Sequence, residues 1–414
     1  MGQVRHLPAF LASFEQVGFG WVWLSILGAN SGRFCIVLVA GYEAFYAGHS
    51  ALWSSMIAMV ILFPMVVVAP LAGGLADRVN RAALMAVGMA VALLASAGAT
   101  VLTATGVVSL PVLVVLVLLI GVGGAVQAPA WQAMLPGMLG GRRLLNGSLL
   151  TRIAQQGSEL SGPAIGTATV ALGGPVAGFG LCTAFYTIGV VTAWHVRRLV
   201  AKPAGHHRGL FRPVVEGLAY VLRRPTLALL MLFVALHCCL TMAFNGLLPA
   251  LATDRLHGGS TVYGVLLTSI GVGAVAGPLL LILFGRRLRD LHVLFVSGFL
   301  SGGLLALLGA VQSLTAAVVV AAGVGASEAT FMAVVYALTQ TITDDHMRGR
   351  VASSQLVITA GSMSVLSMGW GALEGPWGPG LTLLVPGVAF VVAVLAFLPC
   401  ATRFDVRRAP APAT

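Results

Sequence analysis

Hydrophobic residues fill this chain in long blocks, and the polar residues gather in the short segments between those blocks. A helix of about 20 apolar residues crosses the hydrocarbon core of a bilayer. The blocks are continuous and do not alternate residue by residue, as the strands of a membrane β-barrel would. The pattern therefore predicts twelve membrane-spanning helices, at about 18–41, 50–73, 82–105, 109–132, 148–172, 176–196, 226–252, 262–284, 291–311, 314–338, 351–373 and 380–400.

Composition agrees with this interpretation. Of the 414 residues, 58% are hydrophobic and 8% are charged, whereas soluble domains carry about 25% charged residues. The class predicted is an all-α polytopic membrane protein, and a disordered chain, a secreted disulfide scaffold and an ordinary cytosolic enzyme are excluded. The five cysteines all lie in apolar blocks and have no metal-ligand spacing with histidine, so we expect free thiols and no metal or cofactor.

Basic residues concentrate on one side of the predicted spans. With the N-terminus inside, 20 of the 23 Lys and Arg residues fall in inside segments, Arg255 alone falls in an outside loop, and Arg33 and Arg152 lie within spans. An excess of Lys and Arg marks cytoplasmic loops. We therefore expect the chain to lie in a cell membrane, that is, a bacterial inner membrane. Both termini are expected to be in the cytoplasm. The net charge of +11 then reflects topology and implies no nucleic-acid partner.

The longest inside loop divides the chain almost in half. The predicted domains are an N-terminal six-helix bundle (1–196), a cytoplasmic central loop (197–225), a C-terminal six-helix bundle (226–402) and a cytoplasmic tail (403–414). Apolar residues within the central loop share one helical face, which predicts an amphipathic helix lying in the membrane interface. They are Val214, Val215, Leu218, Val221 and Leu222.

A weak internal repeat relates the two halves. The triplet Gly121-Val122-Gly123 recurs 202 residues later as Gly323-Val324-Gly325, and each triplet is followed by a basic turn into the next span. Repeats of six spans in the same orientation are an architecture of secondary transporters.

The sharpest local motif lies between spans 2 and 3, in the segment Gly73–Arg81. Asp77 and Arg81 are four residues apart, which favours pairing on a helical turn, and Asn80 is placed to cap span 3. An ordinary charged turn is the alternative. The segment resembles the Gly-x-Leu-x-Asp-Arg-x-x-Arg signature of the major facilitator superfamily. That resemblance assigns a conformational gating role to Gly74, Asp77, Arg78 and Arg81.

Three further segments resemble the drug:proton antiporter-3 branch of that superfamily, which includes macrolide and enterobactin-type exporters. They are the end of span 4 (129–136), the central-loop helix (216–225) and the turn Arg348-Gly349-Arg350-Val351. The resemblance covers most of the chain. It implies twelve helices in two six-helix bundles, alternating access by rocking of the bundles, and outward transport.

Span 5 carries small residues at Gly157, Gly162, Pro163 and Gly166. They resemble the antiporter motif of exporter families, although Ser158 and Thr167 stand where that motif has glycine. Small residues permit close helix packing, so a generic packing face is the alternative.

The same span has a polar stripe, formed by Arg152, Gln155, Gln156 and Glu159 at i, i+3, i+4 and i+7. A charge inside a membrane helix costs at least about 2.5–3.5 kcal/mol unless it is paired or wetted. We predict that the stripe faces a neighbouring helix or a wet cavity. Glu159 is then either a proton-coupling residue or one partner of a structural ion pair with Arg152 or Arg33.

Other polar residues lie deep within predicted spans. Arg33 and Arg152 are candidates for proton coupling, and Arg33 is also a candidate for binding an anionic group. Glu328 is a second candidate protonation site or a ligand for a cationic substrate. His237 is a candidate too, although packing and one hydrogen bond would satisfy it. Glu43 and Glu374 are expected to be solvated at span ends. The substrate-cavity candidates are Asn30, Arg33, Gln127, Gln155, Gln156, His237, Asn245 and Tyr336.

The sequence thus favours a proton-coupled exporter of an amphipathic small molecule, such as a drug, siderophore or secondary metabolite. A lipid or lysolipid translocator of the same superfamily is the alternative. A membrane enzyme or sensor is disfavoured because no nucleotide loop or nucleophile–base constellation is found. The expected partners are the substrate, protons and the bilayer, and the expected state is a monomer.

Overall fold

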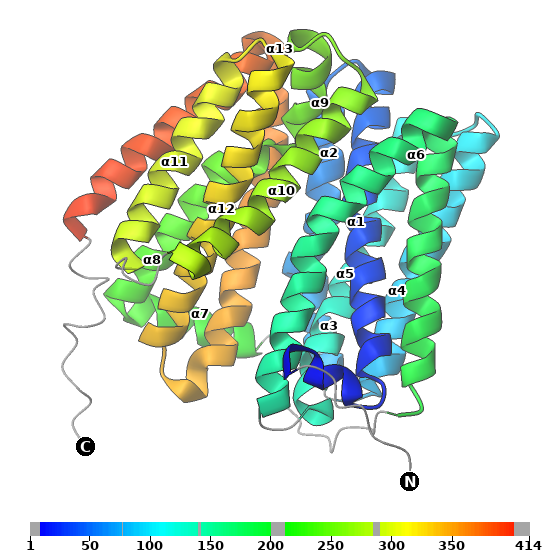
Figure 1. Cartoon of the computed structure of the whole chain (residues 1–414), viewed down its shortest axis with the longest axis vertical. Coiled ribbons are helices and arrows are strands. Elements are labelled where there is room, and N and C mark those ends of the chain that lie inside the picture. The colour runs from blue at the N-terminus through cyan, green and yellow to red at the C-terminus, as the bar shows by residue number, and fades with distance from the viewer. Residues whose placement is uncertain (1–8, 77, 140–141, 200–211, 285–289, 401–414) are drawn as a thin grey trace. The chain divides into compact units, whose positions relative to one another are not determined.

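The computed structural model describes residues 9–76, 78–139, 142–199, 212–284 and 290–400. Every regular element within these residues is helical (Figure 1). Ten of the helices there are long and apolar enough to cross a membrane. The chain is therefore an all-helical integral membrane protein, as its hydrophobic blocks predict.

The helices follow the predicted spans closely, within a few residues at most ends. The first six are α1 (Phe19–Gly48), α2 (Ala51–Leu62), α3 (Pro64–Ala76), α4 (Arg81–Ala104), α5 (Leu110–Met138) and α6 (Arg142–Val196). The later ones are α7 (Arg212–Arg223), α8 (Pro225–His237), α9 (Leu248–Ala250), α10 (Ser260–Phe284), α11 (Asp290–Ala310), α12 (Leu314–Ile342) and α13 (Arg348–Phe397). Helix α1 extends seven residues beyond its predicted end at 41.

Helices α6 and α13 are each about twice as long as one span, and each is broken at one glycine. Gly174 has φ 68° and Gly378 has φ 74°, in the left-handed region that glycine adopts without steric cost. Both glycines fall in predicted gaps between spans, at 172–176 and 373–380.

The predicted span at 226–252 is found at Pro225–Arg255, but its helix changes type along its length. After α8 the chain forms a π-helical segment (Cys238–Met242), a 3₁₀ segment (Ala243–Leu247) and the single turn α9. Pro249 explains part of this change, because proline lacks an N–H and its ring clashes with the carbonyl four residues earlier. The Trp370 indole donates a hydrogen bond to the Cys239 carbonyl at 2.9 Å, which satisfies one backbone group of the distorted helix.

The chain divides by its contacts into two compact units. The first comprises Met1–Ala40 and Val67–Phe211, and the second comprises Gly41–Val66 and Arg212–Thr414. This division differs from the predicted boundaries, because the segment 41–66 belongs to the second unit. Within that unit, the Ser54 hydroxyl donates to the Gly246 carbonyl at 2.6 Å.

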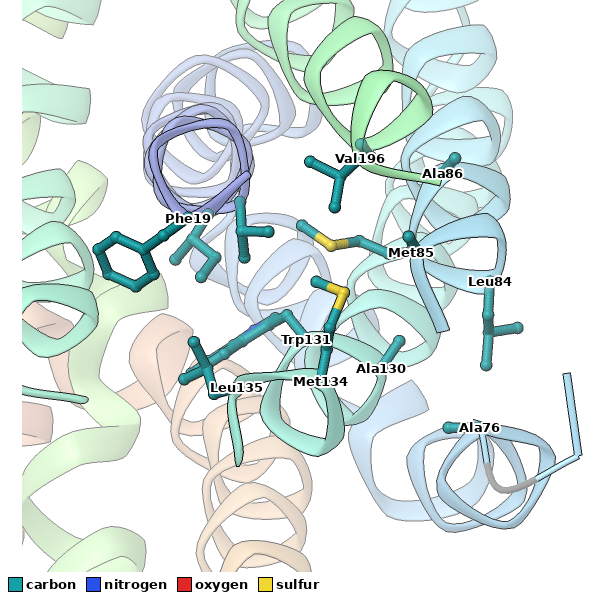
Figure 2. Close-up of a cluster of buried hydrophobic side chains, with 14 of the residues drawn as sticks. Phe19, Ala76, Leu84, Met85, Ala86, Ala130, Trp131, Met134, Leu135 and Val196 are labelled. Carbon is teal, nitrogen blue, oxygen red and sulfur yellow. The ribbon is translucent and has the colours of Figure 1, made fainter. Parts of the chain in front are cut away.

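Each unit has its own apolar core. In the first, side chains from α1, α4, α5 and α6 surround Met85, Trp131 and Met134 (Figure 2). In the second, Phe233 of α8 packs edge-on against Phe331 of α12, with ring centroids 5.1 Å apart. The five cysteines add no cross-link among the described residues, where Cys35, Cys182, Cys238 and Cys239 are free.

Two charged residues stabilise helix ends in the second unit. Glu374 accepts a hydrogen bond from the backbone of Ala51 at the start of α2, where the helix dipole favours a negative charge. Arg255 donates to the carbonyls of Ala310 and Val311 at 2.9 and 3.0 Å, at the end of α11. The expectation that Glu374 is solvated is therefore wrong: it is 8% exposed.

Candidate functional site

The motif between α3 and α4 is built around two polar residues. Asn80 caps α4, because its side-chain oxygen accepts a hydrogen bond from the Ala83 N–H at 3.0 Å; the predicted cap is confirmed. Arg81 donates to the Ala133 carbonyl of α5 at 2.7 Å and to the Ala76 carbonyl at 3.3 Å. Arg81 thus ties the turn to α5, directly beside the core of the first unit.

The remaining members of this motif contribute less to what is seen. Arg78 is exposed and Gly74 is half-buried. Asp77 lies outside the described residues, so its predicted pairing with Arg81 stays a prediction. The gating role of the four residues stays a prediction as well.

The small residues of α6 differ in what surrounds them. A Cβ placed on Gly162 would lie 2.8 Å from the Ser31 carbonyl oxygen and 2.9 Å from the Phe34 Cβ. A Cβ on Gly166 would lie 2.9 Å from a methyl group of Leu38, whereas one on Gly157 would meet nothing within 4 Å. Gly162 and Gly166 therefore bring α6 close to α1, and Gly157 does not.

The two departures from the glycine motif form hydrogen bonds. Ser158 is fully buried; the Ser31 hydroxyl of α1 donates to its hydroxyl at 3.2 Å, and Ser158 itself donates to the Ala154 carbonyl at 2.7 Å. The Thr167 hydroxyl bonds to the Pro163 carbonyl at 2.7 Å, in the turn where proline removes a backbone donor. Serine thus adds a polar contact between α1 and α6.

Arg33 of α1 and Glu159 of α6 lie close enough for their charges to interact. Tyr186, in the second half of α6, also interacts with Arg33, and its ring packs against Gly32. The structure therefore brings together an arginine, a carboxylate and a phenol from three predicted spans. An interhelical arrangement of this kind offsets the cost of placing each charge at this depth.

The other members of the polar stripe, and the other cavity candidates of the first unit, have varied surroundings. Arg152 is exposed, and Gln155 and Gln156 are half-buried. Asn30 donates to the Ile26 carbonyl of its own helix at 2.8 Å, so part of its hydrogen-bonding capacity is used within α1. Gln127 is 4% exposed, beside the close contact of α4 with α5.

His237 lies inside the core of the second unit and has no exposed surface. Its ring stacks on Phe331 at 4.1 Å between centroids, and its Nε2 is 3.1 Å from the Ser301 hydroxyl. Packing and one hydrogen bond, the alternative considered from the sequence, describe this environment. His237 does not line a surface open to a substrate here.

The other candidates of the second unit are spread over several elements. Glu328 of α12 is 7% exposed, and it interacts electrostatically with the thiol of Cys238. Asn245 lies in the 3₁₀ segment and donates to the Met242 carbonyl at 3.4 Å. Tyr336 is exposed on α12.

Two motifs that are far apart in the sequence meet in the second unit. Glu216 of α7 forms an ion pair with Arg350 at 3.0 Å, and the Ser354 hydroxyl donates to the Val214 carbonyl at 3.0 Å. Gly217 lies against the Arg350 backbone, where a side chain would not fit. The central-loop helix is therefore fastened to the start of α13.

A second contact fastens the end of α7. Arg224 pairs with Asp344 at 2.6 Å, and the Asp344 N–H donates to the Tyr220 hydroxyl at 3.2 Å. The Tyr220 hydroxyl, followed by Arg224, holds the pKa of Asp344 below its ordinary value. Sequence reasoning missed Asp344 because it is one of two adjacent acids in the turn after α12 and belongs to no motif.

Sequence reasoning also missed Tyr186 and the pair Cys35–Cys182. The two thiols are buried and hydrogen bonded to each other between α1 and α6. Each of these residues resembles an ordinary apolar position in its own span, and only the packing of α1 on α6 reveals the neighbours. The available signal was the spacing of four between Cys182 and Tyr186.

Comparison with known proteins gives a consistent result. The profile of a family described as transmembrane secretion effectors matches residues 9–409. Macrolide efflux protein A of Streptococcus pyogenes is 27% identical over 261 residues, which span 61% of this chain and 63% of that protein. This chain thus matches less than two thirds of that relative's length.

Several solved transporter structures share the fold. A POT family transporter in complex with 5-aminolevulinic acid has a TM-score of 0.76 at 13% identity, over 94% of this chain and 97% of that one. A bacterial homologue of the human lysosomal transporter Spinster, inward-facing and occupied, has a TM-score of 0.70 at 14% identity, over 95% and 98%. The nucleoside transporter NupG has a TM-score of 0.71 at 13% identity, over 92% and 99%.

Proposed function

Because the chain belongs to the transmembrane secretion effector family of the major facilitator superfamily, we propose that it is a proton-coupled exporter of an amphipathic small molecule. It is a membrane transporter of the major facilitator type. Our proposal adds the direction, the coupling ion and the class of substrate. The direction rests on the efflux relative, and the substrate class rests on that relative and on the apolar character of the spans.

The interaction between Arg33 and Glu159 is the observation that carries the coupling proposal. A carboxylate that exchanges its proton while it stays near a fixed positive charge can switch between a paired and an unpaired state. In our proposal, deprotonated Glu159 pairs with Arg33, and protonation releases Arg33. Glu328 is the second candidate proton site, in the other unit.

The proposed topology has twelve spans, in two six-helix bundles that expose the substrate site to each side of the membrane in turn. The glycine breaks at Gly174 and Gly378 support the count, because each divides a double-length helix into two spans. The distribution of Lys and Arg supports cytoplasmic termini in a cell membrane. A monomer suffices for this mechanism.

Transport into inverted membrane vesicles tests the proposal, because export from the cell corresponds to uptake by such vesicles. Uptake of a substrate panel that includes macrolides, siderophores and lysolipids would be measured with and without a proton gradient. We expect at least one amphipathic compound to accumulate only when the gradient is present. Accumulation that ignores the gradient would remove the coupling claim, and accumulation restricted to lysolipids would favour the lipid translocator.

The Glu159→Gln variant tests the assigned residue. It should bind substrate yet lose the stimulation by the gradient, because glutamine cannot exchange a proton. Glu43→Gln, which neutralises a half-buried acid of α1, the helix that carries Arg33, is the control and should keep that stimulation. Full gradient-driven transport by Glu159→Gln would assign the acid a structural role only.

A further inference from the structure

Helix α7 uses only part of its apolar surface for contact with the rest of the second unit. Val221 is 1% exposed and packs with Leu227, Met231, Met347 and Val351. This buried edge, together with the ion pair to Arg350, holds α7 beside the beginning of α13 (Figure 1).

A second apolar stripe on α7 stays open. Val215, Leu218 and Leu222 are 62%, 40% and 68% exposed. At 3.6 residues per turn they fall within an arc of about 60°, and the buried Val221 lies about 90° from the centre of that arc. Three large apolar side chains on one line are unfavourable in water, because apolar surface gains free energy when it is removed from water.

The position of α7 in the chain indicates what covers the stripe. A single residue, Arg224, separates α7 from α8, which begins the span Pro225–Arg255. Because a span begins at the membrane boundary, α7 lies at the level of the lipid headgroups. Arg223 is exposed and lies on the flank of the stripe, about 100° around the helix from Leu222. An apolar face flanked by basic residues is typical of helices that lie in a membrane interface.

We propose that the stripe Val215–Leu218–Leu222 inserts into the bilayer leaflet at which α8 begins, and that Arg223 gives this contact a preference for anionic phospholipid headgroups. Through the Glu216–Arg350 and Arg224–Asp344 pairs, this contact is fastened to the start of α13 and to the turn that precedes it. The contact does not depend on what the chain transports.

The experiment places a polarity-sensitive fluorophore on a single cysteine at position 222 of the otherwise cysteine-free, full-length protein in vesicles. We expect strong quenching by nitroxide-labelled lipid and weak quenching by aqueous iodide. Asp345, whose side chain is 87% exposed in the turn that contacts α7, is the matched control position. A probe there should be quenched by iodide and not by lipid.

Lipid charge is tested in the same samples. Quenching at position 222 should be stronger with nitroxide-labelled phosphatidylglycerol than with nitroxide-labelled phosphatidylcholine at equal content. Arg223→Gln should reduce that preference by about fivefold, the factor expected for one basic residue near an anionic surface. If the protein labelled at position 222 does not fold, the fluorophore is placed at position 218 instead.

Three outcomes would overturn the proposal. Iodide quenching at 222 equal to that at 345 would show a stripe open to water. Shielding from both quenchers would show that protein covers it. Equal quenching by the two lipids would remove the preference for anionic headgroups.

Discussion

Gly162 offers a direct test of how closely α1 and α6 approach. Replacing it with alanine adds one methyl group at a site where the Cβ would lie 2.8 Å from the Ser31 carbonyl oxygen and 2.9 Å from the Phe34 Cβ. Both distances are well below van der Waals contact, and the nearer atom is backbone. Overpacking of this kind costs about 1–3 kcal/mol.

Gly157→Ala is the matched control because it lies on the same helix and a Cβ there meets nothing within 4 Å. Alanine in place of glycine in a helix gains about 0.5–1 kcal/mol at either position. That gain cancels when the two variants are compared, so the difference between them measures the packing cost alone. We expect Gly157→Ala to unfold at a temperature equal to or above that of the parent, and Gly162→Ala below it.

Gly166→Ala should fall between the two. Its Cβ would meet the Leu38 methyl group at 2.9 Å and the Cys35 sulfur at 3.0 Å, and these side-chain atoms can move more easily than a carbonyl group. Thermal unfolding of the purified protein in one detergent measures all three variants. Equal stabilities for Gly162→Ala and Gly157→Ala would refute the close approach at Gly162.

Three further changes have defined outcomes. Ser158→Ala should lower the free energy of unfolding by about 0.5–1.5 kcal/mol, because the bond to Ser31 is lost; Ser161→Ala, whose contact with Ser31 is 3.5 Å, should have a smaller effect in the same denaturation assay. Arg81→Gln should lower the free energy of unfolding by an amount near the lower end of about 1.5–3 kcal/mol, because the carbonyl contacts of Arg81 are partly exposed. Arg78→Gln, at an exposed position, should change the free energy of unfolding little. Similar losses in the two variants would contradict the tie of Arg81 to α5. The lowered pKa of Asp344 means that its contribution to stability is complete above the ordinary Asp value of about 3.9 and is lost as pH falls through the lower folded value. The difference in unfolding temperature between the parent and Asp344→Asn should therefore hold from neutral pH to about pH 5 and shrink below about pH 4, and a difference unchanged at low pH would contradict the pairing.

Features governed by local rules could be predicted from the sequence. Hydrophobic length placed the spans, the glycines at 174 and 378 fell in predicted gaps, and Asn80 capped the helix that it precedes. Each depends on a few neighbouring residues. The family resemblance rested on equally local motifs, and the family match over 9–409 confirms it.

Features that depend on distant residues could not be predicted. The π-helical segment after His237 relies on Trp370, and the burial of Glu374 relies on the start of α2. Both partners are far away in sequence and have no motif of their own. The amphipathic pattern of α7 could be predicted, but the division of its apolar residues between a buried edge and an open stripe required the position of α13.

The glycine motif and the charged pair of the first unit are parts of one arrangement. Glu159 precedes Gly162 by three residues on α6, and the carbonyl that Gly162 approaches belongs to Ser31, two residues before Arg33 on α1. The close approach that glycine permits therefore sets the separation between the carboxylate and the guanidinium. A methyl group at 162 that pushed the helices apart would weaken their interaction without touching either charge. Reduced gradient coupling in Gly162→Ala, with coupling intact in Gly157→Ala, would follow from this geometry.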